Sequence, residues 1–202
     1  MAEYIDVIPE TQHLLPPPCS ECLWWQTTQG DESGSAPREE WMQGLVSSWG
    51  SAGMVSMRDD QTLAAVQFAP IRALPRTRLL PAGPLSSDAT LLFCLRARLG
   101  HPSSEASRLL HRTMAELRER RVPEIFAYAR PLGSESLCGL RNLCGLEFLE
   151  THGFRVVRGG GDAFLMRIDL RGLLPTIKEA GGLLRAVRSG APRPSPAAWS
   201  GG

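Results

Sequence analysis

The sequence predicts an α/β domain in which helices flank a mixed, mostly antiparallel central sheet. The apolar run within Ala89–Ala97 is nearly continuous, as in a strand that is covered on both faces and lies at the centre of its sheet. Apolar side chains within Ser103–Arg120 recur with the period of an α-helix, which predicts a helix packed on that strand. Two hairpin patterns, at residues 53–69 and 154–170, add antiparallel strands.

The first 50 residues are expected to contain two short strands and a helix. Residues 4–8 alternate loosely and end at Pro9, which predicts the first strand. The prolines at 16–18 predict an extended linker, and Leu23–Trp25 predicts an aromatic strand. A helix is expected to begin near Ser35 and to stop at Gly50. Its apolar face should consist of three residues spaced four apart, Trp41, Leu45 and Trp49.

The middle of the chain is expected to form a hairpin, an irregular crossing and the central strand. Gly53–Met57 and Thr62–Ala69 flank a short polar segment, which predicts two paired strands. Residues 70–88 contain four prolines and little periodicity, which indicates an irregular surface segment. It leads into the central strand and the long helix described above.

The remaining elements alternate again between strand and helix. A strand is predicted over Ile125–Ala129, and a helix over Cys144–His152 should end at Gly153. Phe154–Arg158 and Ala163–Leu170 flank a glycine-rich turn and predict a hairpin. We therefore expect a domain over 1–170, a helical extension over 171–188 (with a weak helix at Leu173–Val187) and a disordered tail over 189–202.

The charge of the chain is balanced overall but unevenly distributed. There are 22 basic and 21 acidic side chains; residues 1–89 hold 5 and 11 of them, and residues 90–202 hold 17 and 10. The scattered arginines of the second half suit a phosphorylated small ligand better than a polyanion, so we expect no nucleic-acid partner. No apolar stretch approaches membrane-spanning length, and the first residues lack the pattern of a signal peptide. We expect a cytoplasmic protein with no membrane association.

The order of these elements resembles the GNAT superfamily of acetyl-CoA-dependent N-acetyltransferases over roughly residues 3–170. Three segments carry the resemblance: the apolar run Leu91–Ala97, the helix Ser103–Leu117 and the sequence Phe148–Phe154, which closes a short helix on Gly-Phe. The segment Cys19–Trp25 further resembles actinobacterial GNAT-like proteins that open with Cys-x-x-Cys and aromatic residues. The resemblance implies acetyl transfer from acetyl-CoA to a primary amine of a small molecule or protein.

The resemblance also implies an acetyl-CoA site at the end of the central strand and the start of the long helix. In the family a Gly-x-Gly loop before this helix holds the CoA pyrophosphate through backbone N–H groups. Here those glycines are replaced by Glu105 and Ser107, so the loop is degenerate, and Arg98 and Arg108 are the candidate charge partners. The candidate cofactor-binding residues are Leu95, Arg96, Ala97, Ser103, Ser104, Glu105, Ala106, Ser107 and Arg108.

No catalytic residue can be assigned from the sequence. Many GNAT enzymes place a tyrosine general acid at the position that is Leu149 here. Glu147, Glu150 and His152 are the ionisable candidates for a base, but a short helix with a solvated face explains them as well. The resemblance therefore leaves open a catalytically inactive GNAT-fold module that contacts a protein partner or a second copy of itself.

The five cysteines leave a third hypothesis, a thiol or zinc regulator built on Cys19 and Cys22. Their spacing suits a metal or a redox pair, but zinc would need two further ligands, for which Cys138 and Cys144 are the only close pair. We expect no metal site and interpret Cys19 and Cys22 as small apolar anchors, and Cys94 as a core residue.

Overall fold

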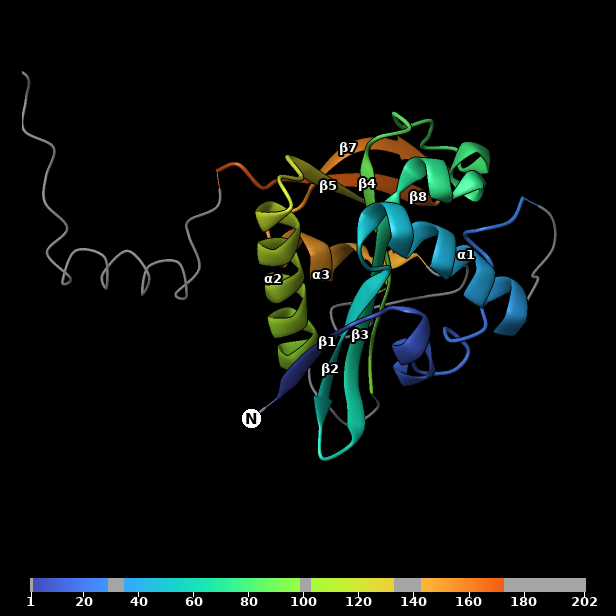
Figure 1. The fold of residues 1–202 in the computed structure, drawn as a ribbon. Coiled ribbons are helices and arrows are strands. Elements are labelled where there is room, and N and C mark those ends of the chain that lie inside the picture. The colour runs from blue at the N-terminus through green and yellow to red at the C-terminus, as the bar shows by residue number, and fades with distance from the viewer. Residues whose placement is uncertain (1, 29–34, 99–102, 133–142, 173–202) are drawn as a thin grey trace, which may run out of the picture. The chain divides into compact units, whose positions relative to one another are not determined.

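The computed structural model describes residues 2–28, 35–98, 103–132 and 143–172, and its strands form one eight-stranded sheet (Figure 1). The strand order is β1-β2-β3-β4-β5-β8-β7, with β6 paired to β5 off this path. The strands are β1 Glu3–Asp6, β2 Gly53–Arg58, β3 Gln61–Pro70, β4 Thr90–Ala97, β5 Glu124–Arg130, β6 Cys144–Gly145, β7 Arg155–Gly160 and β8 Ala163–Asp169. The helices are η1 Pro9–Leu14, α1 Ser35–Trp49, η2 Ile71–Ala73, η3 Pro75–Leu79, α2 Ser103–Glu119 and α3 Leu146–Thr151, where η marks a 3-10 helix.

The sheet is mixed and mostly antiparallel, as predicted. Only the β4–β5 and β5–β6 pairs are parallel. Strand β4 is central, and its residues Thr90–Leu95 are all buried, which explains the continuous apolar run in the sequence. The predicted fold class is confirmed.

Helix α2 packs on the even-numbered face of β2 and β3. Ser56 and Met54 of β2 contact Glu105 and Thr113 of α2 through their side chains. The predicted apolar face of α2 is confirmed, because its members are 0–4% exposed: Leu109, Leu110, Met114 and Leu117.

Helix α1 and the N-terminal segment cover the odd-numbered face. Met42 and Leu45 of α1 belong to the same core cluster as Val55 and Ala65 of the sheet. The apolar face of α1 differs from the prediction, since Met42 is buried whereas Trp41 and Trp49 are only half-buried. One turn before Met42, Arg38 is also buried, so this face of α1 contains a cation.

The predicted aromatic strand at Leu23–Trp25 is wrong. Residues 24–26 form a turn, and the linker at 17–21 is also turn-like instead of extended. In a strand the side chains of Trp24 and Trp25 would point to opposite faces of the sheet. The turn lets both rings pack into the core in a T-shaped pair, with centroids 4.7 Å apart.

The other predicted elements are close to those observed. Residues 70–88 are irregular apart from η2 and η3, and α3 starts two residues later than expected because Cys144–Gly145 pairs with β5. Gly153 ends α3 at a φ of 86°, a conformation that favours glycine. The predicted helix at Leu173–Val187 and the tail at 189–202 lie outside the described residues. None of the described helices is long and apolar enough to cross a membrane.

Candidate functional site

The central feature of the candidate site is the separation of β4 from β5. The two parallel strands pair only at Thr90↔Ile125, Leu91↔Phe126 and Leu92↔Ala127. Further along, β5 pairs with β6 at Ala129↔Cys144. Within the described chain, β4 is paired with β5 only as far as Leu92, whereas its pairing with β3 continues to Ala97.

A β-bulge at Cys94 marks the point where the strands separate. The β3–β4 register passes from Gln67↔Phe93 to Ala65↔Arg96, so two residues of β4 oppose Val66 alone. Cys94 has a φ of 52°, which is uncommon for a residue with a side chain. Such conformations are held by the surrounding structure and cluster at functional sites.

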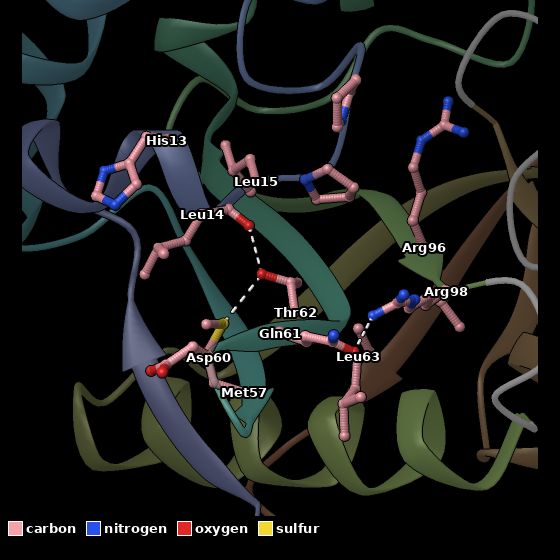
Figure 2. A pocket seen from close by; sticks show the side chains of 14 residues that line it. His13, Leu14, Leu15, Met57, Asp60, Gln61, Thr62, Leu63, Arg96 and Arg98 are labelled. Carbon is pink, nitrogen blue, oxygen red and sulfur yellow. Dashed lines mark hydrogen bonds between the residues drawn. The ribbon is translucent and has the colours of Figure 1, made fainter.

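A pocket of about 610 Å³ opens beside the C-terminal end of β4 (Figure 2). Its walls come from η1 and the prolines after it, the β2–β3 hairpin and the end of β4. The lining residues are His13–Pro17, Met57, Asp60–Ala64 and Arg96–Arg98. Thr62 Oγ1 donates a hydrogen bond to the Leu14 carbonyl at 2.7 Å and holds η1 against β3. Figure 2 shows the two arginines at one end of the pocket and His13 and Asp60 at the other.

The start of α2 follows the end of β4 after a few residues, which keeps the two parts of the predicted cofactor site close. Ser104 and Arg108 are exposed on α2, whereas Glu105 and Ala106 face the sheet. Leu95 is buried, and Arg96 and Ala97 are half-buried at the pocket. Ser107 is half-buried as well, so the described side chains of the predicted set range from exposed to fully buried.

Glu105 is held by two hydrogen bonds beneath the first turn of α2. Its carboxylate is 4% exposed and accepts from Ser56 Oγ at 2.7 Å and from Arg108 Nη1 at 2.7 Å. Burial acts to raise the pKa of Glu105, but the bonds from Ser56 and Arg108 outweigh it, so the pKa lies below its usual value. The negative charge is therefore retained and partly neutralised by Arg108.

The three candidate bases lie on α3 or at its end, with mostly local partners. Glu147 accepts a hydrogen bond from the Leu132 amide at 3.3 Å, and His152 Nδ1 lies 2.7 Å from the Phe148 carbonyl. Glu150 is exposed. Leu149, at the position of the family's tyrosine acid, is fully buried in the core. His152 also lies beside His111 of α2, with ring centroids 5.2 Å apart.

Sequence reasoning missed two residues of this region. Arg38 was overlooked because an arginine within a helix is normally solvated, and Cys94 because a thiol in an apolar strand is normally core. A bulge leaves no mark in the sequence when its residue is not glycine. The packing of Cys19 and Cys94 in one core cluster was equally invisible, because 75 residues separate them in the chain.

Comparison with solved structures shows the same fold in several acetyltransferases. An N-acetyltransferase from Staphylococcus aureus Mu50 has a TM-score of 0.53 at 11% identity, covering 84% of this chain and 99% of that one. Polyamine N-acetyltransferase from Drosophila melanogaster also has a TM-score of 0.53, at 12% identity, covering 84% of this chain and 100% of that one. The loading GNATL domain of CurA from Lyngbya majuscula gives 0.53 at 10% identity, covering 86% and 100%.

The sequence itself matches no protein-family profile and no curated protein significantly. At these identities the structural likeness concerns the fold and leaves the chemistry to be argued from the site. The chain has the fold of the GNAT N-acetyltransferases.

Proposed function

We propose that this protein is an N-acetyltransferase that transfers an acetyl group from acetyl-CoA to a primary amine of a small molecule or protein. The observation that supports it most is the separation of β4 from β5 at the Cys94 bulge. Beyond Leu92, where the pairing of β4 with β5 ends, backbone groups of β4 would engage the amides of the pantetheine arm. A thioester seated there would lie next to the bulge.

The phosphates of acetyl-CoA would be held at the start of α2. The first N–H groups of a helix have no partner within it, and they favour a negative ligand. Arg108 is exposed in the first turns of α2, and Arg98 is exposed at the end of β4. Arg98 donates to Gln61 Oε1 and Arg108 is paired with Glu105, so both cations would have to share these bonds with the pyrophosphate.

The acceptor amine would enter through the pocket beside β4. This pocket lies on the β3 side of the strand and ends at Arg96 and Ala97. An amine bound there would lie beside the same end of β4 that is proposed to hold the thioester. Catalysis would come mainly from this proximity and from backbone N–H groups that stabilise the oxyanion.

The cellular setting fits the same proposal. We propose a cytoplasmic location, with which the four free thiols among the described cysteines are compatible. Within the described residues no group of three His, Cys, Asp or Glu side chains could hold a metal ion, and acetyl transfer in the proposed form needs none.

A catalytically inactive GNAT-fold module that binds a protein partner or a second copy is the alternative. Two observations favour it: Leu149 fills the position of the tyrosine acid, and Glu105 stands in the phosphate loop. Acetyl-CoA binding distinguishes the two functions, since only the enzyme requires it.

Isothermal titration with acetyl-CoA should show saturable binding to the native chain and several-fold tighter binding to Glu105→Gly. The substitution removes a negative charge near the pyrophosphate and releases Arg108 to bind it. The melting temperature should fall, because the buried Ser56 hydroxyl loses its acceptor, which costs roughly 1–3 kcal/mol, and glycine lowers helix propensity by up to about 1 kcal/mol.

Glu105→Gln is the matched control, because it removes the charge but keeps an acceptor for Ser56. It should tighten binding with a smaller loss of stability, whereas Arg108→Ala should weaken binding. Binding to the glycine variant alone would favour the inactive module. If no form binds at millimolar acetyl-CoA, the proposed function is wrong.

A further inference from the structure

The pocket beside the end of β4 carries opposite charges at its two ends (Figure 2). The guanidinium groups of Arg96 and Arg98 lie at the β4 end. The carboxylate of Asp60 lies at the other end, which η1 and the β2–β3 turn form. Apolar side chains line the pocket as well: Leu14, Leu15, Met57 and Leu63. A ligand that complements this pocket is negative near β4, positive near the turn and partly apolar.

The arginine end suits a carboxylate. A guanidinium binds a carboxylate through two parallel N–H···O bonds, whereas it repels an ammonium group. Arg96 is half-buried at this end, and Arg98 is exposed. Arg98 donates to the neutral amide oxygen of Gln61, and within the described residues no carboxylate forms an ion pair with it. The chain therefore leaves the charge of Arg98 for an anion from outside.

Asp60 is the second residue of a two-residue turn between β2 and β3. Arg58 and Gln61 pair across this turn. Asp59 and Asp60 have φ values of 50° and 58°, and glycine is the preferred second residue in such turns. Within the described part of the chain, Asp60 has no ion pair or side-chain hydrogen bond that would explain an aspartate there. Its exposed carboxylate is available to a cation in the pocket.

We propose that the pocket selects a free α-amino acid with a cationic side chain as the acceptor. The α-carboxylate would bind Arg96 and Arg98, the side-chain cation would pair with Asp60, and the α-amine would lie beside the end of β4. This inference rests on the proposed acetyl transfer and names its acceptor. The N-terminus of a protein is disfavoured, because its first α-carbon carries an amide carbonyl in place of a carboxylate.

The arginines would also favour the reactive form of the amine. An amine attacks a thioester only when it is neutral, and nearby positive charges disfavour its ammonium form. In the transfer, the amine nitrogen bonds to the acetyl carbon while the bond from that carbon to the CoA sulfur breaks. CoA leaves as a thiolate, and the nitrogen releases one proton to water. The same two side chains would thus bind the carboxylate and promote attack by the amine next to it.

Calorimetry tests the charge pattern, first without cofactor, because Arg98 is also a proposed partner of the pyrophosphate, and then with saturating CoA. L-arginine is the probe. Agmatine lacks its carboxylate, L-argininamide replaces the carboxylate by an amide, and L-citrulline keeps the carboxylate but has a neutral side chain. We expect agmatine and L-argininamide to bind roughly tenfold weaker than L-arginine, or weaker still, and L-citrulline several-fold weaker. Equal affinity for agmatine and L-arginine, or no binding of L-arginine at millimolar concentration in either condition, would overturn the proposal.

Two substitutions in the turn separate a specific contact from the general field of the turn. Asp60→Gly should lower the affinity for L-arginine to that for L-citrulline and leave L-citrulline unchanged. Its melting temperature should stay level or rise, because glycine relaxes the turn. Asp59→Gly is the matched control, since it removes the same charge from the same turn but does not line the pocket. It should bind L-arginine like the native chain, and equal losses in both variants would overturn the role of Asp60.

Substitutions at the other end test the carboxylate contact. Arg96→Gln and Arg98→Gln remove a charge but keep a hydrogen-bond donor. Each should weaken L-arginine and L-citrulline by similar factors and reduce the preference for L-arginine over agmatine. A preference over agmatine that stays unchanged in both variants would show that the carboxylate binds elsewhere and would overturn the proposal.

The choice of acceptor and the acetyl transfer can fail separately. Mass spectrometry after incubation with acetyl-CoA should find N-acetyl-L-arginine and little acetylated agmatine. Selective binding of L-arginine without an acetylated product would support the amino-acid site and contradict the proposed function. Acetylation of agmatine or L-argininamide as fast as that of L-arginine would overturn the amino-acid site and leave the acetyltransferase standing.

Discussion

Replacing Leu110 with aspartate should abolish the cooperative thermal unfolding of the chain. Leu110 is 0% exposed on the face of α2 that packs against the sheet. The substitution loses the burial of a leucine, worth roughly 1.5–3 kcal/mol, and places a carboxylate where no cation can pair with it. Together, the lost burial and the cost of the buried carboxylate are comparable with the total free energy of unfolding of many domains. Circular dichroism during heating would measure it.

Ser104→Asp is the control for the charge itself. Ser104 is exposed in the first turn of the same helix, where a negative charge is favourable. We expect its melting temperature to equal or exceed that of the native chain. A Leu110→Asp variant that melts within a degree or two of the native protein would mean that the assigned packing face of α2 is wrong.

The stability of the native chain relative to Cys19→Ser should increase between pH 6 and pH 9. The pKa of Cys19 falls from 9.0 to about 6 on folding, because of Cys94, Arg96 and Arg38. Between these values the unfolded chain still binds a proton that the folded chain has lost, so rising pH favours the folded state. The stabilisation is complete at a pH above the pKa of Cys19 in the unfolded chain. It disappears as the pH falls through the pKa of Cys19 in the folded chain.

The contribution of Cys19 ionisation to the free energy of unfolding should be on the order of a few kcal/mol, since each pKa unit corresponds to about 1.4 kcal/mol. Urea denaturation of both proteins at several pH values would measure it, with Cys144→Ser, a buried thiol of β6, as the control. The groups that act on Cys19 from neighbouring segments are Cys94, Arg96 and Arg38. Stability curves that stay parallel for the native chain and Cys19→Ser would show that Cys19 is protonated at neutral pH.

The sheet and α2 were predictable because their sequence patterns are long and consistent. The unbroken apolar run of β4 can only be a strand buried on both faces, and the stripe on α2 repeats over four turns. The segment Leu23–Trp25 was predicted wrongly because its aromatic residues have a high propensity for strands. In the structure the segment forms a turn, and the turn places both tryptophan rings in the core.

The candidate site was predictable only in part. The resemblance predicts a site at the end of β4 and the start of α2, and this stays a prediction; it could not show that Glu105 turns toward Ser56. The bulge at Cys94 and the burial of Arg38 depend on contacts between segments that are far apart in the chain. Periodicity describes neighbours within one element, so it cannot reveal a cluster assembled from the N-terminal turn, α1 and β4.

Hydrogen–deuterium exchange with and without acetyl-CoA would test directly where the proposed cofactor binds. The amides of Leu95–Ala97 and of the first turn of α2 should exchange more slowly when acetyl-CoA is present, because the pantetheine arm and the pyrophosphate would engage them. Strands β7 and β8, on the far side of β5, serve as the internal reference and should not change. Equal exchange at the end of β4 and the start of α2 with saturating acetyl-CoA, or protection confined to other segments, would contradict the account.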